Sequence, residues 1–409
     1  MNIIIIRNRQ NRKVINLKLT NHVNFIGVQN PAMRTFDIIM RTEYGTSYNS
    51  YLIKGKEYAI IETVHEDFIP EFLELIEEEV SIKKIKYVIL NHTEPDHSGS
   101  LKKLIELNPD ILVYGTSAAI KNLSSIMNID FHSKIVKQGD RLDLGNGVVL
   151  EFIVAPNLHW PDSMFTYLEA DKTLFTCDFF GCHFCEPMVL DRHIKAKDMY
   201  YKELKNYYDC IFSPFKKFVN SGMDKIEDLD IEFIATSHGP VLEEMIPYVK
   251  EKYREWSVEQ KEHVDKKVAI FYVSAYGYTR KMAKLFKDTF EQAGIHVKCY
   301  DMLEHPMEEM AKEMNEADAV LFGSPTINRD ALRPIWDLIA MTEVISVKNK
   351  PALVFGSYGW SGEACKLLVD RLNGIKYNVF GEGVRCVFNP SECDIENIKE
   401  AAMDFLQLL

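Results

Sequence analysis

Short apolar runs of strand character alternate with a few helical stretches over roughly the first 256 residues of the chain. Seven runs have this strand character: 51–53, 58–61, 87–90, 111–114, 148–154, 164–168 and 233–235. Residues 68–80 and 100–108 have helical periodicity. The segment 165–175 has the pattern of a hairpin. We therefore expect antiparallel strand pairs as well as strands joined by crossover connections. Together these patterns predict sheets packed face to face with helices on the outside.

The pattern changes after a strongly charged segment, residues 248–267, which is helical to about Trp256 and then becomes a polar connector. Five further strands are predicted beyond it: 268–273, 296–300, 319–322, 352–355 and 384–388. Helices lie between them, including 280–292, and residues 394–409 close the chain. Strands that alternate with helices in this way predict a five-stranded, doubly wound parallel sheet. We therefore expect one domain in residues 1–260 and a second in residues 261–409.

Composition narrows the class of protein. A chain of 409 residues is too long for one ordinary core, which agrees with two domains. Its net charge of -12 argues against nucleic acid or an acidic membrane surface as a partner. No apolar run approaches the length of a membrane span, and no signal peptide is recognisable. The eight cysteines do not form a disulfide framework, so we expect a cytoplasmic protein.

The segment 91–99 carries the densest set of chemically active side chains. It follows the apolar run 87–90 and contains two imidazoles and two carboxylates within six residues. These are His92, Glu94, Asp96 and His97. Pro95 prevents the segment from being an ordinary helix interior, so the side chains spread from a strand-to-helix turn. Capping of the next helix by Asp96 or Ser98 is the simpler alternative, but the density of metal-binding groups predicts a site for two ions.

Two ions need more ligands than this segment supplies, and three later residues stand where ligands are expected. His159, Asp178 and His238 each follow an apolar strand, as His92 does. A single histidine at such a place is more often a packing or capping residue, so the argument rests on their shared position. Four imidazoles and three carboxylates favour iron or manganese over zinc. Iron is preferred because carboxylates compensate its change of charge, and zinc is not excluded.

The segment after Asp178 contains Cys182, His183 and Cys185. The two cysteines could be a redox pair, could form a further metal site with His183, or could simply pack near the centre. A single C-x-x-C motif is weak evidence for any of these. The role of the three residues stays open at the level of sequence.

Three loops of the second domain have the composition of a phosphate and flavin site. The first is a hydroxyl-rich turn with glycine between the strand 268–273 and the helix 280–292. The others follow the third and fourth strands, where ligands of such sheets bind. The residues expected to bind the cofactor are Ser274, Ala275, Tyr276, Gly277, Tyr278, Thr279, Ser324, Pro325, Thr326, Ile327, Asn328, Ser357, Tyr358, Gly359, Trp360, Ser361 and Gly362.

The first loop is too small for two phosphates and lacks the G-x-G-x-x-G pattern, so a mononucleotide is favoured over a dinucleotide. Tyr358 and Trp360 could stack on an aromatic ring. Plain turns with surface aromatic residues are the alternative for any one loop. Three such loops at successive strand ends resemble flavodoxin and indicate FMN.

The first domain resembles the metallo-β-lactamase fold, whose hydrolases carry His-x-His-x-Asp-His. Here Glu94 takes the place of the second histidine, and a flavodoxin-like domain follows. That combination resembles the flavodiiron proteins, or A-type flavoproteins, over nearly the whole chain, and segment 159–165 matches them as well. The resemblance implies an α/β protein, in which an αββα metallo-β-lactamase-like sandwich precedes a flavodoxin-like doubly wound five-stranded parallel sheet.

The resemblance also implies a ligand set. One iron would be held by His92, Glu94 and His159, and the other by Asp96, His97 and His238. Asp178 would bridge the two irons, and no catalytic residue is expected beyond these ligands. Two features depart from the family pattern. Residues 1 to about 16 look like an extra leader, and the cysteines after Asp178 stand where a cysteine-free segment is expected.

The activity implied by the resemblance is reduction of O2 to water, of NO to N2O, or of both. Electrons would pass through FMN from an external carrier such as rubredoxin. Family members pair head to tail, so a homodimer or a dimer of dimers is implied. The rival hypothesis is a binuclear zinc hydrolase that carries a flavodoxin-like domain. The preference between the two gases and the identity of the donor cannot be obtained from the sequence.

Overall fold

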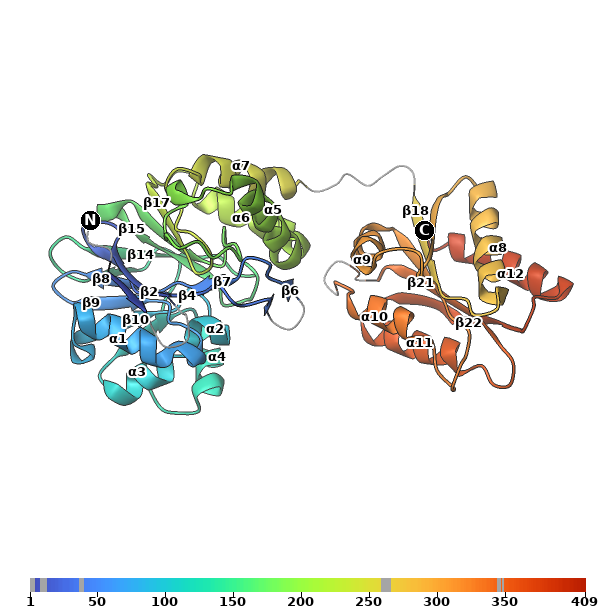
Figure 1. Ribbon diagram of the computed structural model, residues 1–409, viewed down its shortest axis with the longest axis horizontal. Helices are drawn as coiled ribbons and strands as arrows, with labels where there is room; N and C mark the ends of the chain where they lie inside the picture. The colour runs from blue at the N-terminus through green and yellow to red at the C-terminus, as the bar shows by residue number, and fades with distance from the viewer. Residues whose placement is uncertain (1–3, 8–12, 37–39, 259–265, 344–346, 348) are drawn as a thin grey trace. The chain divides into compact units, whose positions relative to one another are not determined.

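The computed structural model describes residues 4–7, 13–36, 40–258, 266–343, 347 and 349–409. The chain divides into two compact units, Met1–Glu259 and Gln260–Leu409 (Figure 1). No helix of the described ranges combines the length and the apolar character needed to cross a membrane.

The first unit contains a ten-stranded mixed sheet. Its path runs β12-β11-β10-β9-β8-β3-β2-β4-β7, and β1 pairs with β2 beside this path. Pairing is parallel from β9 to β12 and antiparallel elsewhere. The strands are β1 (Ile4–Arg7), β2 (Lys13–Lys18), β3 (Val23–Phe25), β4 (Val28–Asn30), β7 (Thr46–Tyr48), β8 (Tyr51–Lys54), β9 (Tyr58–Ile61), β10 (Ile85–Ile89), β11 (Leu112–Gly115) and β12 (His132–Ile135).

A second, five-stranded sheet has the order β13-β14-β15-β16-β17. Its strands are β13 (Arg141–Asp143), β14 (Val149–Val154), β15 (Met164–Leu168), β16 (Thr173–Cys177) and β17 (Phe233–Thr236). The predicted hairpin is confirmed, because β15 and β16 pair antiparallel with Thr166 opposite Phe175. The last pair, β16 with β17, is parallel. A small ribbon of β5 (Thr35–Phe36) and β6 (Met40–Arg41) stands apart from both sheets.

Helices cover the outer faces of the two sheets (Figure 1). The helices of this unit are α1 (Ile69–Glu79), α2 (Pro95–Ser98), α3 (Leu101–Leu107), α4 (Ser117–Met127), α5 (Lys197–Tyr207), α6 (Lys216–Lys225) and α7 (Ile246–Trp256). Shorter helical turns are η1 (Glu66–Phe68), η2 (Ile82–Lys84), η3 (Glu169–Asp171), η4 (Asp191–His193), η5 (Tyr208–Phe212, a π-helix) and η6 (Ser213–Phe215). Helices α1, α3 and α4 lie along one side, and α5, α6 and α7 along the other.

Both faces of β8 are buried over residues 51–53, which explains why these three positions carry no charged side chain. In β8, Tyr51 and Ile53 face the core between the two sheets, whereas Leu52 packs toward the helices. Side chains of a strand alternate between its faces, so a run with no polar position fits a strand covered on both sides. The expected αββα sandwich is therefore confirmed.

The start of the chain contains strands that the sequence pattern did not predict. Residues 13–16 of the suspected leader belong to β2, which pairs with β3 and β4 inside the large sheet. The strands from β3 to β7 were also missed. They have two or three residues each, too few to show a period, and they become strands by pairing with other segments. Of the suspected leader, residues 1–3 and 8–12 lie outside the described residues.

The second unit is a five-stranded parallel sheet in the order β19-β18-β20-β21-β22. Its strands are β18 (Lys267–Tyr272), β19 (His296–Asp301), β20 (Ala319–Gly323), β21 (Pro351–Tyr358) and β22 (Asn378–Val387). Its helices are α8 (Tyr278–Gln292), α9 (Met307–Glu316), α10 (Arg333–Ala340), α11 (Glu363–Gly374) and α12 (Glu392–Leu406). The predicted doubly wound sheet is confirmed, and this strand order is the flavodoxin-like one.

Helices cover both faces of this sheet, as Figure 1 shows. Ile270 of β18 packs with α8 and α12, whereas its neighbour Phe271 packs with α9, α10 and α11. Each strand thus supplies side chains to two cores in turn. The parallel order directs the carboxyl ends of the strands to one edge, where the loops expected to bind FMN begin.

The core under α8 gives a test of this packing. Phe286 is fully buried and its ring lies against those of Phe290 and Phe355. We expect Phe286→Ala to lower the free energy of unfolding of the second unit by about 3–5 kcal/mol, because it removes buried contacts and leaves a cavity. Urea titration of the full chain measures the effect. Lys284→Ala, on the exposed side of the same helix, is the control and should change stability by less than about 0.5 kcal/mol.

Candidate metal centre

The first four predicted ligands lie where β10 passes into α2. Pro95 occupies the first turn of α2, so His92 and Glu94 precede the helix while Asp96 and His97 belong to it. The two imidazoles are almost fully buried. This change from loop to helix directs the four side chains to different sides, as the proline predicts.

One group of ligand atoms surrounds Oδ2 of Asp178. His159 Nε2 lies 3.2 Å from that oxygen and His92 Nε2 lies 3.7 Å from it. The same two nitrogens are 3.3 Å and 3.2 Å from Glu94 Oε2. His92, Glu94, His159 and Asp178 each offer one atom within 4.8 Å of the others.

The second group surrounds the other oxygen of the same carboxylate. Asp178 Oδ1 lies 3.1 Å from His97 Nε2 and 3.4 Å from His238 Nε2. Asp96 Oδ2 lies 3.4 Å and 3.0 Å from those two nitrogens. Asp178 therefore stands between the two groups, with one oxygen directed to each. All seven predicted metal ligands are brought together.

Strand topology explains why residues so far apart in sequence converge. His159, Asp178 and His238 follow β14, β16 and β17, which belong to the second sheet. Cys177 lies opposite Thr236 in the parallel pair of β16 and β17, so the next residues of both strands leave at the same edge. The loop after β10 of the first sheet meets them there.

Several buried donor and acceptor atoms of the centre have no hydrogen-bond partner in the described ranges of the chain. They are both carboxylate oxygens of Asp96, Oδ1 of Asp178 and Nε2 of His97. A buried polar atom without a partner costs free energy, and such atoms are rare in folded proteins. Metal ions coordinated by these atoms would remove that cost. The donor set thus fits two cations on the evidence of its own unsatisfied groups.

The charge state of the carboxylates suits a cation. Burial opposes the ionisation of Asp178, but His97, His159 and His238 outweigh it and hold its pKa well below the usual range. Burial likewise opposes ionisation of Glu94, and hydrogen bonds to His159 and His92 lower its pKa nonetheless. Ionised carboxylates next to imidazoles are the form that binds metal.

The second nitrogen of two ligand imidazoles is held by the protein. His92 Nδ1 lies 3.2 Å from Asp162 Oδ1, and Thr93 donates from its N–H and its hydroxyl to Asp162 Oδ2 at 2.8 and 2.6 Å. His238 Nδ1 donates to the carbonyl oxygen of Ser47 at 2.6 Å. Such contacts fix the orientation of metal-binding histidines. Neither Asp162 nor Ser47 was predicted from the sequence to hold a ligand. The one feature that pointed to Asp162 was the position of a carboxylate three residues after His159.

Behind His97 lies a third cluster, made with Glu62 and Cys177. Burial raises the pKa of Glu62 to about 8. One of its oxygens accepts a hydrogen bond from the N–H of Asn91 at 2.8 Å, and the other has no hydrogen-bond partner within the part of the chain that the structure describes. This buried carboxyl group supports the segment that carries the first four ligands.

The segment after Asp178 lies beside the centre. Cys182 and His183 are buried and Cys185 is half-buried. No disulfide bond joins cysteines in the described part of the chain, so Cys182 and Cys185 are not linked to each other. Burial and the nearby His238 lower the pKa of His183 well below its ordinary value, which keeps this imidazole neutral.

In the second unit, the three loops expected to bind FMN start at one edge of the sheet. Tyr272 pairs with Gly323, and Gly323 with Phe355, so β18, β20 and β21 reach this edge side by side. Gly277 has a φ of +83° and immediately precedes α8. Tyr278 and Thr279, expected in the loop, therefore lie in the first helical turn.

Hydroxyl groups connect these loops. Thr279 Oγ1 lies 2.9 Å from Ser357 Oγ, Ser274 Oγ accepts from the N–H of Arg280, and Ser324 Oγ accepts from the N–H of Leu332. Backbone N–H groups at the start of α8, a helix terminus that suits an anion, lie beside these hydroxyl groups. Tyr276 is 84% exposed and Trp360 is 99% exposed, so both rings are available to a planar ligand.

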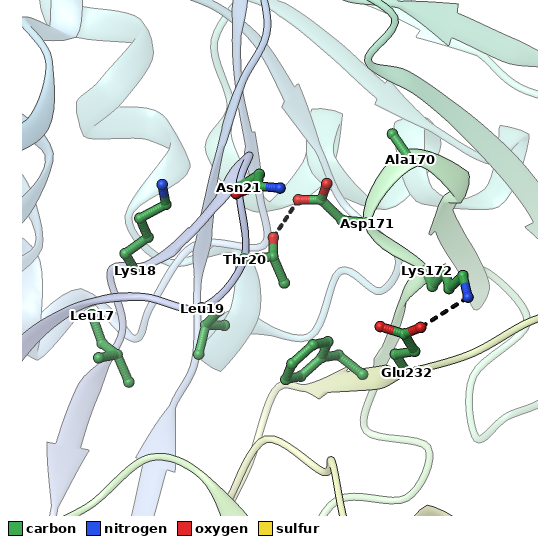
Figure 2. Close-up of a pocket in the computed structure, with 10 residues that line it drawn as sticks. Leu17, Lys18, Leu19, Thr20, Asn21, Ala170, Asp171, Lys172 and Glu232 are labelled. Carbon is green, nitrogen blue, oxygen red and sulfur yellow. Dashed lines mark hydrogen bonds and ion pairs between the residues drawn. The ribbon is translucent and has the colours of Figure 1, made fainter. Parts of the chain in front are cut away.

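A hollow of about 750 Å³ in the first unit is not this centre. It lies beside residues 17–21 and 170–172, and none of the predicted ligands lines it (Figure 2). Three of its charged groups are already paired, since Asp171 accepts from Thr20 and Lys172 lies 2.8 Å from Glu232. It therefore gives no reason to place chemistry there.

Comparison with known families agrees with the two units. Residues 46–239 match the model described as ODP family beta lactamase, and residues 270–401 match the flavodoxin model. Among solved structures, rubredoxin oxygen:oxidoreductase from Desulfovibrio gigas has a TM-score of 0.71 at 27% identity, over 96% of this chain and 98% of that one. The flavodiiron protein of Giardia intestinalis has a TM-score of 0.68 at 28% identity, over 96% of each chain.

The fold and the paired ligand groups thus define a binuclear metal domain joined to a flavodoxin domain. The flavo-diiron protein FprA2 of Clostridium acetobutylicum is 48% identical to this chain over 95% of its length and 98% of that protein. The type A flavoprotein of Rhodobacter capsulatus is 35% identical to this chain, over 91% of this chain and 87% of that protein. The chain belongs to the flavodiiron protein family. It is an oxidoreductase of the diiron and FMN type, and the hydrolase alternative is not favoured.

The contact of Asp162 with His92 can be tested directly. We expect Asp162→Asn to weaken metal binding by about 10–100-fold, because the amide keeps the shape but loses the charge that orients the imidazole. Metal content per chain and competition with a chelator measure the effect. Asp228→Asn, at an exposed position, is the matched control. Equal metal affinity in the two variants would show that Asp162 does not orient His92.

Proposed function

We propose that the protein reduces O2 to water, NO to N2O, or both, at a diiron centre in residues 1–260, with FMN bound by residues 261–409. The observation that carries this proposal is the position of Asp178, whose two oxygens face two separate groups of ligand atoms. A carboxylate in this position suits a bridge between two cations. The carboxylate-rich set favours iron over zinc.

The assignment of ligands follows the two groups. His92, Glu94 and His159 would hold one iron, and Asp96, His97 and His238 the other, with Asp178 shared. The seventeen loop residues named above would hold FMN, whose phosphate would lie at the start of α8. Two irons and one flavin supply four electrons when fully reduced, the number that one O2 needs to become two waters, whereas coupling two NO molecules needs two.

The residues of the chain have three tasks at this centre. Asp178 sets the spacing of the two ligand groups. Asp162 and Ser47 hold His92 and His238 in the orientation that presents Nε2 to a metal. Burial of the donors keeps bulk water from competing with a small gaseous substrate.

The electron donor and the assembly are part of the same proposal. The Desulfovibrio gigas relative is named as a rubredoxin oxygen:oxidoreductase, which supports rubredoxin or a similar small carrier as the donor here. We also propose a head-to-tail homodimer, or a dimer of dimers, in the cytoplasm. The absence of disulfide bonds among the described cysteines supports a reducing compartment.

The function is tested by anaerobic purification, counting iron and FMN per chain, and comparing steady-state consumption of O2 and of NO with a rubredoxin and its reductase. We expect two irons, one FMN and turnover of at least one gas. Asp178→Asn should lower both iron content and turnover by at least about tenfold, since it removes the charge shared by both groups. Zinc without iron, together with ester hydrolysis, would support the hydrolase instead.

The flavin site has its own test. Thr279→Val removes a buried hydroxyl while keeping the shape of the side chain. We expect at least about tenfold weaker FMN binding, because a hydrogen bond to a charged phosphate is lost. Fluorescence quenching on addition of FMN to flavin-free protein measures the affinity. Thr289→Val, further along α8, is the matched control, and its hydroxyl donates to the Leu285 carbonyl oxygen of the same helix.

A further inference from the structure

His183 is a buried imidazole beside the metal centre that belongs to neither ligand group. Its side chain is only 2% exposed. Its Nε2 has no hydrogen-bond partner among the residues that the structure describes. A buried nitrogen of this kind is costly unless something else binds it.

The ring of His183 is held in place on several sides. Its centroid lies 4.3 Å from that of Phe36, 4.9 Å from Tyr207 and 5.0 Å from the ligand His238. Its Nδ1 lies 2.8 Å from the hydroxyl oxygen of Thr46 on β7. The ring therefore has a fixed orientation, with one nitrogen used and the other free.

The contacts of Thr46 favour one tautomer of His183. His238 Nδ1 donates to the carbonyl oxygen of Ser47 at 2.6 Å, so it carries a hydrogen and cannot accept from the Thr46 hydroxyl. We assign the shorter remaining contact, 2.8 Å to His183 Nδ1 rather than 3.4 Å to the Ser47 carbonyl oxygen, as the hydrogen bond that this hydroxyl donates. A neutral imidazole that accepts at Nδ1 carries its own proton on Nε2.

The ring of His183 lies next to the second ligand group. Its centroid is 5.0 Å from that of His238, whose Nε2 faces Asp96 and Asp178. A donor so placed lies beside the second metal position.

We propose that His183 donates a hydrogen bond from Nε2 to the small molecule that enters the metal centre, a diatomic gas or small anion with an electronegative terminal atom. This inference rests on the proposed function, since it requires a metal-loaded centre. It gives His183 a role in substrate binding that the seven ligands do not supply. Thr46 acts through His183 as a positioning residue, because its hydroxyl fixes the tautomer.

The test uses azide as a probe of the oxidised, iron-loaded protein, with binding followed by absorption. His183→Phe keeps a flat ring but removes the donor, and we expect azide to bind about tenfold more weakly or worse. His183→Gln can place an amide N–H near the same point and should restore part of the affinity. Thr46→Val should fall between the wild type and His183→Phe. His132→Phe, at an exposed position, is the control and should bind azide normally.

Iron and FMN are counted in every variant. Weaker azide binding in His183→Phe at unchanged iron content, with partial recovery in His183→Gln, supports the proposal. Unchanged azide affinity in His183→Phe overturns it, and shows that Nε2 is satisfied by ordered water alone. Equal loss of iron in both variants also overturns it, because His183 would then only support the ligands. A wild-type protein that binds no iron would instead contradict the proposed function.

Discussion

The structure depends on one arrangement that costs free energy: the charged and polar side chains of the metal centre lie together in a buried interior. Asp178 and Asp96 are almost fully buried, and several of their oxygens have no hydrogen-bond partner among the residues described. The four neighbouring imidazoles offset only part of this cost in free energy, because the Nε2 atom of each one is needed to bind a metal. The sandwich supplies the rest by packing two apolar cores around the centre, so that the ligands cannot move apart to find water.

Much of this arrangement follows from the sequence because each ligand comes directly after a recognisable strand. His92, His159 and His238 all stand one to five residues beyond an apolar run, and parallel neighbours end at the same edge. The sequence does not predict the groups that contact the Nδ1 atoms of these imidazoles. Asp162 belongs to a turn, and Ser47 acts through its backbone carbonyl, which any residue could provide.

The same contrast holds in the second unit. Turn chemistry locates the three loops, because Gly277 and the hydroxyl residues lie at strand ends. The exact start of α8 does not follow from the pattern, since a positive φ at Gly277 allows the helix to begin at once and draws Thr279 into its first turn. The short strands from β3 to β7 were missed for a related reason. Their structure comes from long-range pairing, and it is β7 that brings Thr46 and Ser47 to the metal centre.

The loop that carries His183 is tied to the loop of His238 by backbone contacts, which explains how a non-ligand can have a fixed place there. The N–H of Cys182 donates to the carbonyl oxygen of His238 at 3.2 Å. Gly239 has a φ of +77°, and a Cβ at that position would lie 2.4 Å from the Cys182 carbonyl oxygen. Only glycine permits this approach. A change at Gly239 would therefore displace His183 and His238 together.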